Sequence, residues 1–278
     1  MLKTHSVRQL GARDTTAVLR ALDRDPVVSC MVAARVQAHG VDPNRLQGEL
    51  LTQGRVEDSL CFSGVNLVPL SGSPQAVRAF SDRVRRRPRS CSSLVGPADL
   101  VMAMWSELEG TWGAARDVRP EQPLLALTGA LRHAPDPLVR PVQMHELDVY
   151  LPAAVAMFTE EVGVDPRGSD GGRSYRHRVA DLIAGGRAWA RFEHGEVVFK
   201  AEIGSVSALA GQIQGVWVHP EWRGRGLGAA GTAAVAAGVQ AGGRVPSLYV
   251  NDFNAPARAA YRRVGFTQVG TFATVLLH

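Results

Sequence analysis

The most constraining stretch of this sequence lies between residues 212 and 240, where an apolar run, a glycine-rich loop and a helix-like segment follow one another. Residues 212–218 favour a strand that Pro220 ends, and residues 227–240 carry apolar side chains at helical spacing. Glycines before a helix leave the N–H groups of its first turn open, and the helix dipole adds positive potential there. The stretch therefore predicts a strand–loop–helix unit that binds an anion, best suited to a phosphate or pyrophosphate.

The glycine-rich loop has the pattern R-G-x-G-x-G from Arg223 to Gly228, and it follows a V-x-V-x-P strand end. It lacks the G-K-[ST] element of a Walker-type nucleoside triphosphate site. It also lacks the early strand–G-x-G-x-x-G unit with a downstream acid that a dinucleotide-binding fold needs. A tight turn without a ligand is the structural alternative.

A second motif runs from Asn254 to Phe266 with the spacing N-x-x-A-x-x-x-Y-x-x-x-G-F. Asn254 is a good N-cap and Gly265 can end a helix, so we expect a helix between them. Tyr261 shares one face of this helix with apolar residues, and a packed core tyrosine is the alternative to a functional one.

Together the two motifs resemble the acetyl-CoA-binding loop and the tyrosine-bearing C-terminal element of the GNAT superfamily of N-acetyltransferases, over roughly residues 141–278. The resemblance implies an α/β fold with a mixed sheet and acetyl-CoA as co-substrate. It also implies transfer of the acetyl group to an amine, of a small molecule or of a protein, by direct attack on the thioester. The sequence does not identify the acceptor.

The resemblance also assigns roles to residues of both motifs. The splayed end of the strand would offer backbone groups of Val216 and Val218 to the pantetheine and the acetyl carbonyl, and the loop would hold the pyrophosphate. The Tyr261 hydroxyl would protonate the departing thiolate. The residues expected to contact acetyl-CoA are Val216, Trp217, Val218, Arg223, Gly224, Arg225, Gly226, Leu227, Gly228, Asn254, Ala257 and Tyr261.

The general base is less defined, because Gln212 and Gln214 lie on the strand where many family members carry a carboxylate. Glu202, in an otherwise apolar strand, is our candidate for this catalytic role, and a structural ion pair with Lys200 or an arginine is the alternative. Further candidates are His219 and Glu221. A water chain to solvent would need no dedicated base.

A proline-rich stretch, residues 131–141, divides the chain of 278 residues nearly in half and predicts two domains, 1–135 and 136–278. The first half has the element order β-β-β-α-β-α of the second half without its glycine loop. We therefore expect a degenerate GNAT-like domain that binds no CoA and shapes the acceptor cleft. With residues 212–218 and 247–254, the chain resembles actinobacterial acetyltransferases that carry an extra N-terminal domain of unassigned function, and residues 61–69 and 91–97 match the pattern of that domain.

Periodicity and turn residues predict the individual elements. In the first half we expect helices at 15–22, 27–36 and 98–108, an arginine-tailed helix from about 76 to 84, and strands at 49–52, 59–63, 67–70 and 92–95. In the second half we expect helices at 145–162, 173–184, 227–240 and 255–264, and strands at 142–144, 188–192, 197–203, 212–218, 247–250 and the C-terminal region. Residues 194–196 predict a hairpin turn, and Pro152 predicts a kink or a new helix start.

The formal net charge of +5 includes 31 basic residues, of which only Lys3 and Lys200 are lysines. The one dense basic run, from Arg83 to Arg89, closes a helix-like segment, where cations suit the negative end of the helix dipole. We interpret the run as a solvated helix end and do not expect nucleic-acid binding, because surface aromatic residues are not interleaved with it.

No apolar run reaches the roughly 18 residues of a membrane span, and the N-terminus from Met1 shows no secretory signal. Three widely spaced cysteines, Cys30, Cys61 and Cys91, argue against a disulfide framework and a cysteine zinc site, and we expect no metal. The sequence thus predicts a soluble, cytoplasmic protein of unknown oligomeric state.

Two other functions compete with acetyl transfer. A CoA-binding regulatory protein without catalysis would explain the missing strand carboxylate, although Tyr261 counts against it. A nucleic-acid-associated protein would use the arginine run.

Overall fold

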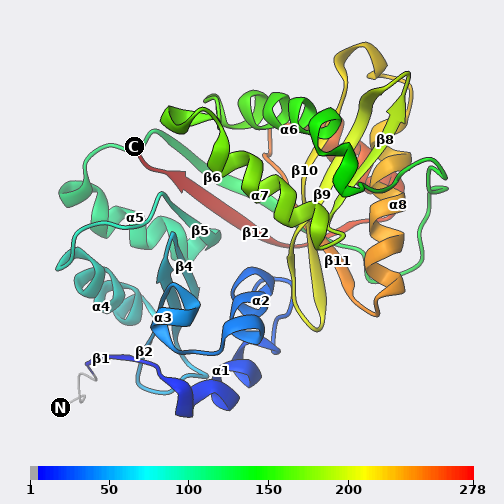
Figure 1. Ribbon diagram of the computed structural model, residues 1–278. Helices are drawn as coiled ribbons and strands as arrows, with labels where there is room; N and C mark the ends of the chain where they lie inside the picture. The colour runs from blue at the N-terminus through cyan, green and yellow to red at the C-terminus, as the bar shows by residue number, and fades with distance from the viewer. Residues whose placement is uncertain (1–5) are drawn as a thin grey trace.

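A mixed sheet of twelve strands runs through residues 6–278, the residues that the computed structural model describes (Figure 1). The strand order is β1-β2-β3-β4-β5-β12-β6-β11-β10-β9-β8-β7. The predicted mixed α/β class is therefore confirmed. Residues 1–5, on which the prediction of no secretory signal partly rests, lie outside the described part of the chain.

The two halves of the chain repeat one order of elements, apart from the short helix α3 (Pro43–Leu46) in the first half. The first half contains β1 (Val7–Gln9), α1 (Thr15–Leu22), α2 (Cys30–His39), β2 (Gly48–Gln53), β3 (Leu60–Gly64), β4 (Asn66–Ser71), α4 (Pro74–Arg85), β5 (Ser93–Pro97), α5 (Ala98–Trp112) and β6 (Asp117–Ala126). The second half contains β7 (Arg140–Pro141), α6 (Leu147–Val162), α7 (Arg173–Ala184), β8 (Ala188–Glu193), β9 (Glu196–Val206), β10 (Ala210–Val218), α8 (Leu227–Ala241), β11 (Val245–Tyr249), α9 (Ala255–Val264) and β12 (Thr267–Leu276).

The predicted elements differ from the structure at a few places. Helices α1, α7 and α9 have the expected bounds, and His194 and Gly195 form the expected hairpin turn between β8 and β9. The expected new helix start at Pro152 is wrong, since α6 is continuous through it and packs its apolar face into the core. The expected strand 142–144 is also wrong: the Glu146 carboxylate accepts the Gln143 N–H at 2.8 Å and holds a 3-10 turn there. Strand β6 was not predicted.

The last strand of each half lies beside the fifth strand of the other half. Strand β6 pairs with β11, with Leu124 opposite Tyr249, and β12 pairs with β5, with Thr274 opposite Val95. The two exchanged strands also pair with each other, and Figure 1 shows them as the long green and red strands between the halves. This exchange makes the two halves parts of one continuous sheet.

The second half is built in three layers. Helix α8 packs on one face of β9 and β10, and α6 and α7 lie against the other face. Small residues allow the close approach of α8: a Cβ at Gly231 would lie 2.5 Å from the buried Phe199 ring of β9. The alanines and glycines of α8 thus allow its close packing on the sheet.

The three cysteines are free and buried, and burial raises the pKa of each thiol. Within residues 6–278, no helix is long and apolar enough to cross a membrane. The same residues hold no group of three metal-ligating side chains that could bind a metal ion.

The packing of α8 on β9 gives a stability prediction. Gly231→Ala should lower the free energy of unfolding by about 1–3 kcal/mol, because the added methyl group meets the buried Phe199 ring. The control is Gly110→Ala in α5, where a Cβ meets no atom within 4 Å, and where helix propensity should make the change neutral or stabilising by up to about 1 kcal/mol. Urea unfolding measures both, and equal effects of the two variants would contradict the close contact.

Candidate functional site

The parallel strands β10 and β11 separate partway along their length. They pair only over residues 210–212 and 245–247. A β-bulge after Gln214 then turns β10, and Gly215 in the bulge has a φ of +57°, a conformation that favours glycine. A Cβ at Gly215 would also lie 2.9 Å from the Met157 methyl carbon. The bulge opens a gap between the two strands.

The backbone of Val216 and Val218 faces this gap. The His219 N–H donates to the Val198 carbonyl of β9 at 3.0 Å, and successive peptide groups of a strand point to opposite sides. The peptide groups of Val218, and of Val216 two residues earlier, therefore point away from β9. The Val218 carbonyl already has a hydrogen-bond partner, because it accepts from Arg223 Nε at 3.0 Å.

Helix α8 begins with an uncapped N-terminus. Its N-cap residue, Gly226, has a φ of +85° and no side chain to accept a hydrogen bond. Among the described residues, the N–H groups of Leu227 and Gly228 have no hydrogen-bond partner. Helix α4, at the equivalent place in the first half, is capped instead: the Ser73 hydroxyl accepts from the Ala76 N–H at 3.3 Å. Of these two helix starts, that of α8 is the one open to an anion.

The two arginines of the glycine-rich loop already have partners. Arg223 Nη2 lies 2.8 Å from both carboxylate oxygens of Glu160, which also accepts from Trp217 Nε1 at 3.1 Å. The Arg225 guanidinium lies 5.0 Å from the centre of the Trp222 ring. Arg223 therefore links the loop to the end of α6, while Arg225 remains exposed.

A cavity of about 560 Å³ lies beside the gap, bounded by β10, β11, α6 and α7. Five of the predicted site residues line it: Glu202, Val216, Trp217, Asn254 and Tyr261. Val218, Ala257 and the loop 223–228 are outside its lining. One wall is apolar and aromatic, formed by Met157, Phe158, Tyr175, Val179 and Leu182. The structure thus brings the predicted catalytic residues to one cavity and places the loop outside it.

Tyr261 is buried in α9 with its ring edge-on to Phe266, the ring centres 6.2 Å apart. Its hydroxyl has no hydrogen-bond partner among residues 6–278, although the residue lines the cavity. Burial, and to a lesser degree the charge of Glu161, raises the pKa of this phenol well above its ordinary value. The hydroxyl therefore keeps its proton at neutral pH and is available as a donor.

Glu202 forms a buried ion pair. Lys200 Nζ, with no exposed surface, lies 2.6 Å from Glu202 Oε1. Tyr150 Oη and Gln214 Nε2 each donate to the same carboxylate at 3.4 Å. Burial raises the pKa of Glu202, but the charge and hydrogen bond of Lys200 outweigh it, and the pKa is lowered. Glu202 thus lines the cavity, as predicted for a base, and also forms the ion pair with Lys200 that was the structural alternative.

The last turn of α6 also belongs to the site, although no sequence motif marks it. Glu160 and Glu161 both line the cavity, Glu160 bound to Arg223 and Glu161 exposed to the solvent within it. Although part of its surface is open to the cavity, the surrounding protein keeps bulk water from the Glu161 carboxylate, and this desolvation, the largest effect, raises its pKa. Two carboxylates at a helix end carry no motif, and only the packing of α6 against β10 brings them to the cavity.

Strand β6, from the first half, supports two residues of the cavity. Arg119 Nη2 donates to the Glu161 carbonyl at 2.8 Å. Gln122 Nε2 donates to the Asn251 side chain at 2.8 Å, and Gln122 in turn accepts from Thr274 of β12 at 2.6 Å. The exchanged strands thus reach the wall of the cavity.

Comparison with known proteins agrees with this geometry. The family described as "FR47-like protein" matches residues 201–275, and "Domain of unknown function (DUF4081)" matches residues 48–150. No curated protein matches the sequence. Among solved structures, a Drosophila protein is similar with a TM-score of 0.69 at 12% identity, over 98% of this chain and 99% of that one.

Two further solved structures are similar over nearly the whole chain. A GNAT-family acetyltransferase from Colwellia psychrerythraea has a TM-score of 0.57 at 10% identity, covering 98% of this chain and 100% of that one. A tandem GNAT protein from the clavulanic acid biosynthesis pathway has a TM-score of 0.51 at 14% identity, covering 97% of each. The chain has the GNAT-type acetyltransferase fold.

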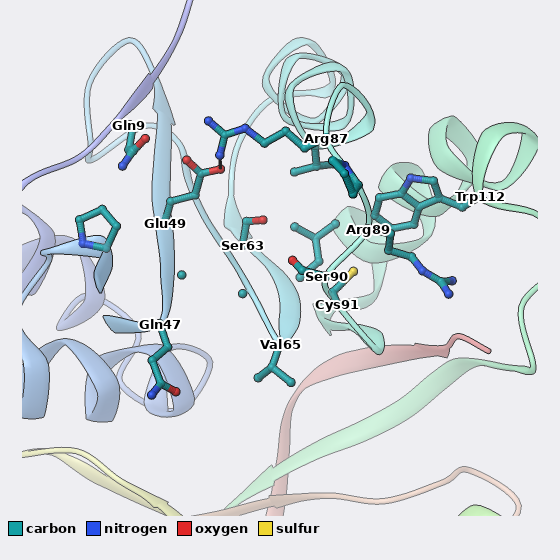
Figure 2. A pocket seen from close by; sticks show the side chains of 16 residues that line it. Gln9, Gln47, Glu49, Ser63, Val65, Arg87, Arg89, Ser90, Cys91 and Trp112 are labelled. Atoms are coloured by element: carbon teal, nitrogen blue, oxygen red, sulfur yellow. Dashed lines mark hydrogen bonds and ion pairs between the residues drawn. The ribbon is translucent and has the colours of Figure 1, made fainter. Parts of the chain in front are cut away.

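The first half of this GNAT-type structure has a different cavity, of about 400 Å³ (Figure 2). It lies where β4 and β5 begin, lined by Val65 and Cys91 among others. The cavity of the second half lies instead near the ends of β10 and β11. The two cavities therefore occupy opposite ends of equivalent strand pairs.

Ion pairs occupy most of the arginine run of this first half. Arg83 and Arg87 both bind the buried Glu49 carboxylate, at 3.3 and 2.9 Å, and Figure 2 shows the Arg87 pair. Arg85 pairs with Asp82, and Arg89 Nη2 donates to the His278 carbonyl at 2.5 Å. The run thus ties the end of α4 to the sheet and to the C-terminal strand, beyond the solvated helix end that the sequence suggested.

The buried Lys200–Glu202 pair gives a prediction about stability. Lys200→Met should lower the free energy of unfolding by about 3–5 kcal/mol at pH 7, because Glu202 would remain buried without a counter-charge. The loss should shrink as the pH falls from 7 towards about 4.3, the ordinary pKa of a glutamate, because the unpaired buried carboxyl has a raised pKa and becomes neutral over that range. The double variant Lys200→Met/Glu202→Leu should recover most of the stability. Urea unfolding of both variants across pH tests this, and a single variant within about 1 kcal/mol of wild type would contradict it.

Proposed function

We propose that the protein is an acetyl-CoA-dependent N-acetyltransferase that transfers the acetyl group to an amine by direct attack on the thioester. One observation carries this proposal: a hydroxyl without a protein partner, that of Tyr261, faces a cavity beside the gap between β10 and β11. The uncapped start of α8 supports it.

We infer that the cofactor follows the gap. The backbone groups of Val216 and Val218 would bind the pantetheine, and the open N–H groups of α8 would bind the pyrophosphate. For this, Arg223 would release the Val218 carbonyl that it now holds. Trp217, Asn254 and Ala257 would complete the contacts, with Gly224, Arg225, Gly226, Leu227 and Gly228 around the phosphates.

Tyr261 would act as the general acid of the transfer. The attacking amine nitrogen needs a lone pair, and the departing sulfur needs a proton. A thiol has an ordinary pKa of about 8.5 and a phenol of about 10, close enough for a positioned transfer. The raised pKa of Tyr261 keeps the donor protonated. Glu202 is the base that the sequence suggested, and its ion pair with Lys200 weakens it as a proton acceptor.

We propose that the first half, domain 1–135, braces the acceptor cleft of domain 136–278 and binds no CoA. The Ser73 cap on α4 and the contacts of Arg119 and Gln122 with the cavity wall support this role. The resemblance to actinobacterial acetyltransferases with an extra N-terminal domain, and a cytoplasmic location, remain predictions from the sequence.

A CoA-binding regulatory protein without catalysis is the second candidate, favoured by the engagement of Glu202 with Lys200. Release of CoA thiol from acetyl-CoA in the presence of primary amines decides between the two. Turnover supports the enzyme, and tight CoA binding without turnover supports the regulator.

The proposed pyrophosphate site gives a prediction about affinity. Gly228→Asp and Gly228→Asn add side chains of equal shape where the nearest atom to a Cβ is 3.8 Å away, so neither should strain the fold. The Asp variant should bind CoA about tenfold more weakly than the Asn variant, because only its carboxylate repels the phosphates. Calorimetric titration measures both, and equal affinities would remove the α8 start from the site.

The proposed general acid gives a second prediction. Tyr261→Phe keeps the ring and its packing on Phe266, so stability and CoA affinity should change little. Turnover should fall by about 10²–10⁴-fold. Steady-state kinetics measures this loss. A Phe variant within a few-fold of wild type would leave Tyr261 as a core residue and make solvent the proton source.

A further inference from the structure

Glu161 is the cavity carboxylate that has no cationic partner within the described residues. Glu160 binds Arg223 at 2.8 Å, and Glu202 binds Lys200 at 2.6 Å. No ion pair or side-chain hydrogen bond to the Glu161 carboxylate occurs within residues 6–278, although the residue lines the cavity. This carboxylate is therefore free to bind a cation from solution.

The position of Glu161 is fixed by the first half of the chain. Its carbonyl accepts from Arg119 Nη2 at 2.8 Å, which holds the last turn of α6 against β6. Arg119 itself is occupied, since its Nε donates to the Asp117 carboxylate at 2.8 Å. The Glu161 carboxylate is thus carried on a fixed backbone with the Arg119 charge nearby, but within residues 6–278 it forms no ion pair with this arginine.

Glu161 and Tyr261 share one electrostatic environment. Glu161, Tyr249 and Tyr261 line the same cavity, and the charge of Glu161 adds to the raised pKa of both phenols. The other charged groups around Glu161 are Arg119 on β6 and Lys200 and Glu202 on β9, with Glu160 on its own helix and Arg178 and Tyr175 on α7 also lining the cavity. Arg178 is the one basic residue in that lining, against three acidic ones.

We propose that the acceptor is a primary amine that enters as its ammonium ion, and that the Glu161 carboxylate binds this ion and then removes its proton. The inference rests on the proposed acetyl transfer and names its substrate class and base. The apolar wall of Met157, Phe158 and Tyr175 fits an alkyl or aromatic skeleton. Glu161 takes the part of base that the sequence assigned to Glu202.

The protons of this step balance. The R–NH₃⁺ ion gives one proton to the Glu161 carboxylate and becomes R–NH₂. The nitrogen forms a bond to the thioester carbon, the carbon–sulfur bond breaks, and Tyr261 gives its proton to the sulfur. The nitrogen then gives its second proton to the Tyr261 oxygen, and Glu161 releases the first proton to solvent. The products are the acetamide, CoA thiol and one proton.

Binding tests the first part of the proposal. The probes are 2-phenylethylamine, hexylamine and spermidine, with 2-phenylethanol as the neutral analogue, titrated into the CoA-saturated protein. Glu161→Gln should weaken binding of the amines by about tenfold or more and leave that of the alcohol unchanged. Asp148→Asn, at the exposed start of the same helix, is the matched control and should change neither.

Turnover against pH tests the second part. At pH 7, Glu161→Gln should lower kcat/KM for the amines by about 10²–10⁴-fold. The ammonium ion of a primary amine has a pKa of about 10. At pH 9.5, more of the substrate is therefore neutral than at pH 7, and this neutral fraction needs no base. The ratio of wild-type to variant kcat/KM should therefore fall by about tenfold or more between the two pH values. A merely structural loss would not depend on pH.

The outcomes separate this inference from the proposed function. Failure of the wild type to bind acetyl-CoA overturns both. Binding of acetyl-CoA without binding or acetylation of any amine probe overturns the inference alone. It is also overturned if Glu161→Gln stays within threefold of wild type at pH 7, if its loss is equal at both pH values, or if Glu202→Gln shows the pH-dependent loss instead.

Discussion

The bulge at Gly215 is the feature on which the candidate site depends. Up to Gln212, β10 is an ordinary sheet strand paired with β11, and beyond the bulge its peptide groups face a gap. A one-residue bulge also exchanges the two faces of a strand. It directs Trp217 towards α6 and Val216 towards α8. Lys200 Nζ lies 3.2 Å from where a Cβ at Gly215 would be, so this glycine also leaves room for the buried ion pair.

The exchange of β6 and β12 makes the other half of the chain part of the same site. A strand that belongs in sequence to the first half lies against β11 and carries Arg119 and Gln122 to the cavity wall. The two halves could not separate without breaking the hydrogen bonds that pair β6 with β11 and β12 with β5. The proline-rich connection after β6 adds to this, because Asp136 is buried and pairs with Arg191 of β8 at 2.9 Å. A boundary visible in the sequence is thus a packed segment in the structure.

Local patterns predicted the elements that carry them and missed those that depend on packing. The loop, the Asn254 cap and the helix up to Gly265 could be predicted because backbone geometry demands those residues there. Strand β6 was missed because four of its first five residues are exposed and it contains two prolines, while its apolar end is short. Glu161 could not be found, since its role comes from the contact of a helix end with a strand far away in the sequence. For Glu202, the sequence offered a cavity position and an ion pair with Lys200, since residues two apart on a strand share a face, but only the structure shows that both occur together.

The two halves show how small a difference separates an open helix start from a closed one. Both place a strand, a helix and a parallel strand in the same order, so both direct a helix N-terminus and its dipole to the end of a strand. In the first half, two residues connect β4 to α4, and the Ser73 hydroxyl satisfies the first turn from within. In the second half, the longer loop after β10 ends in Gly226, which has no side chain to do so. In the first half, the positive end of the helix dipole therefore meets a capping side chain of the protein itself. In the second half, it is open to an anion from solution.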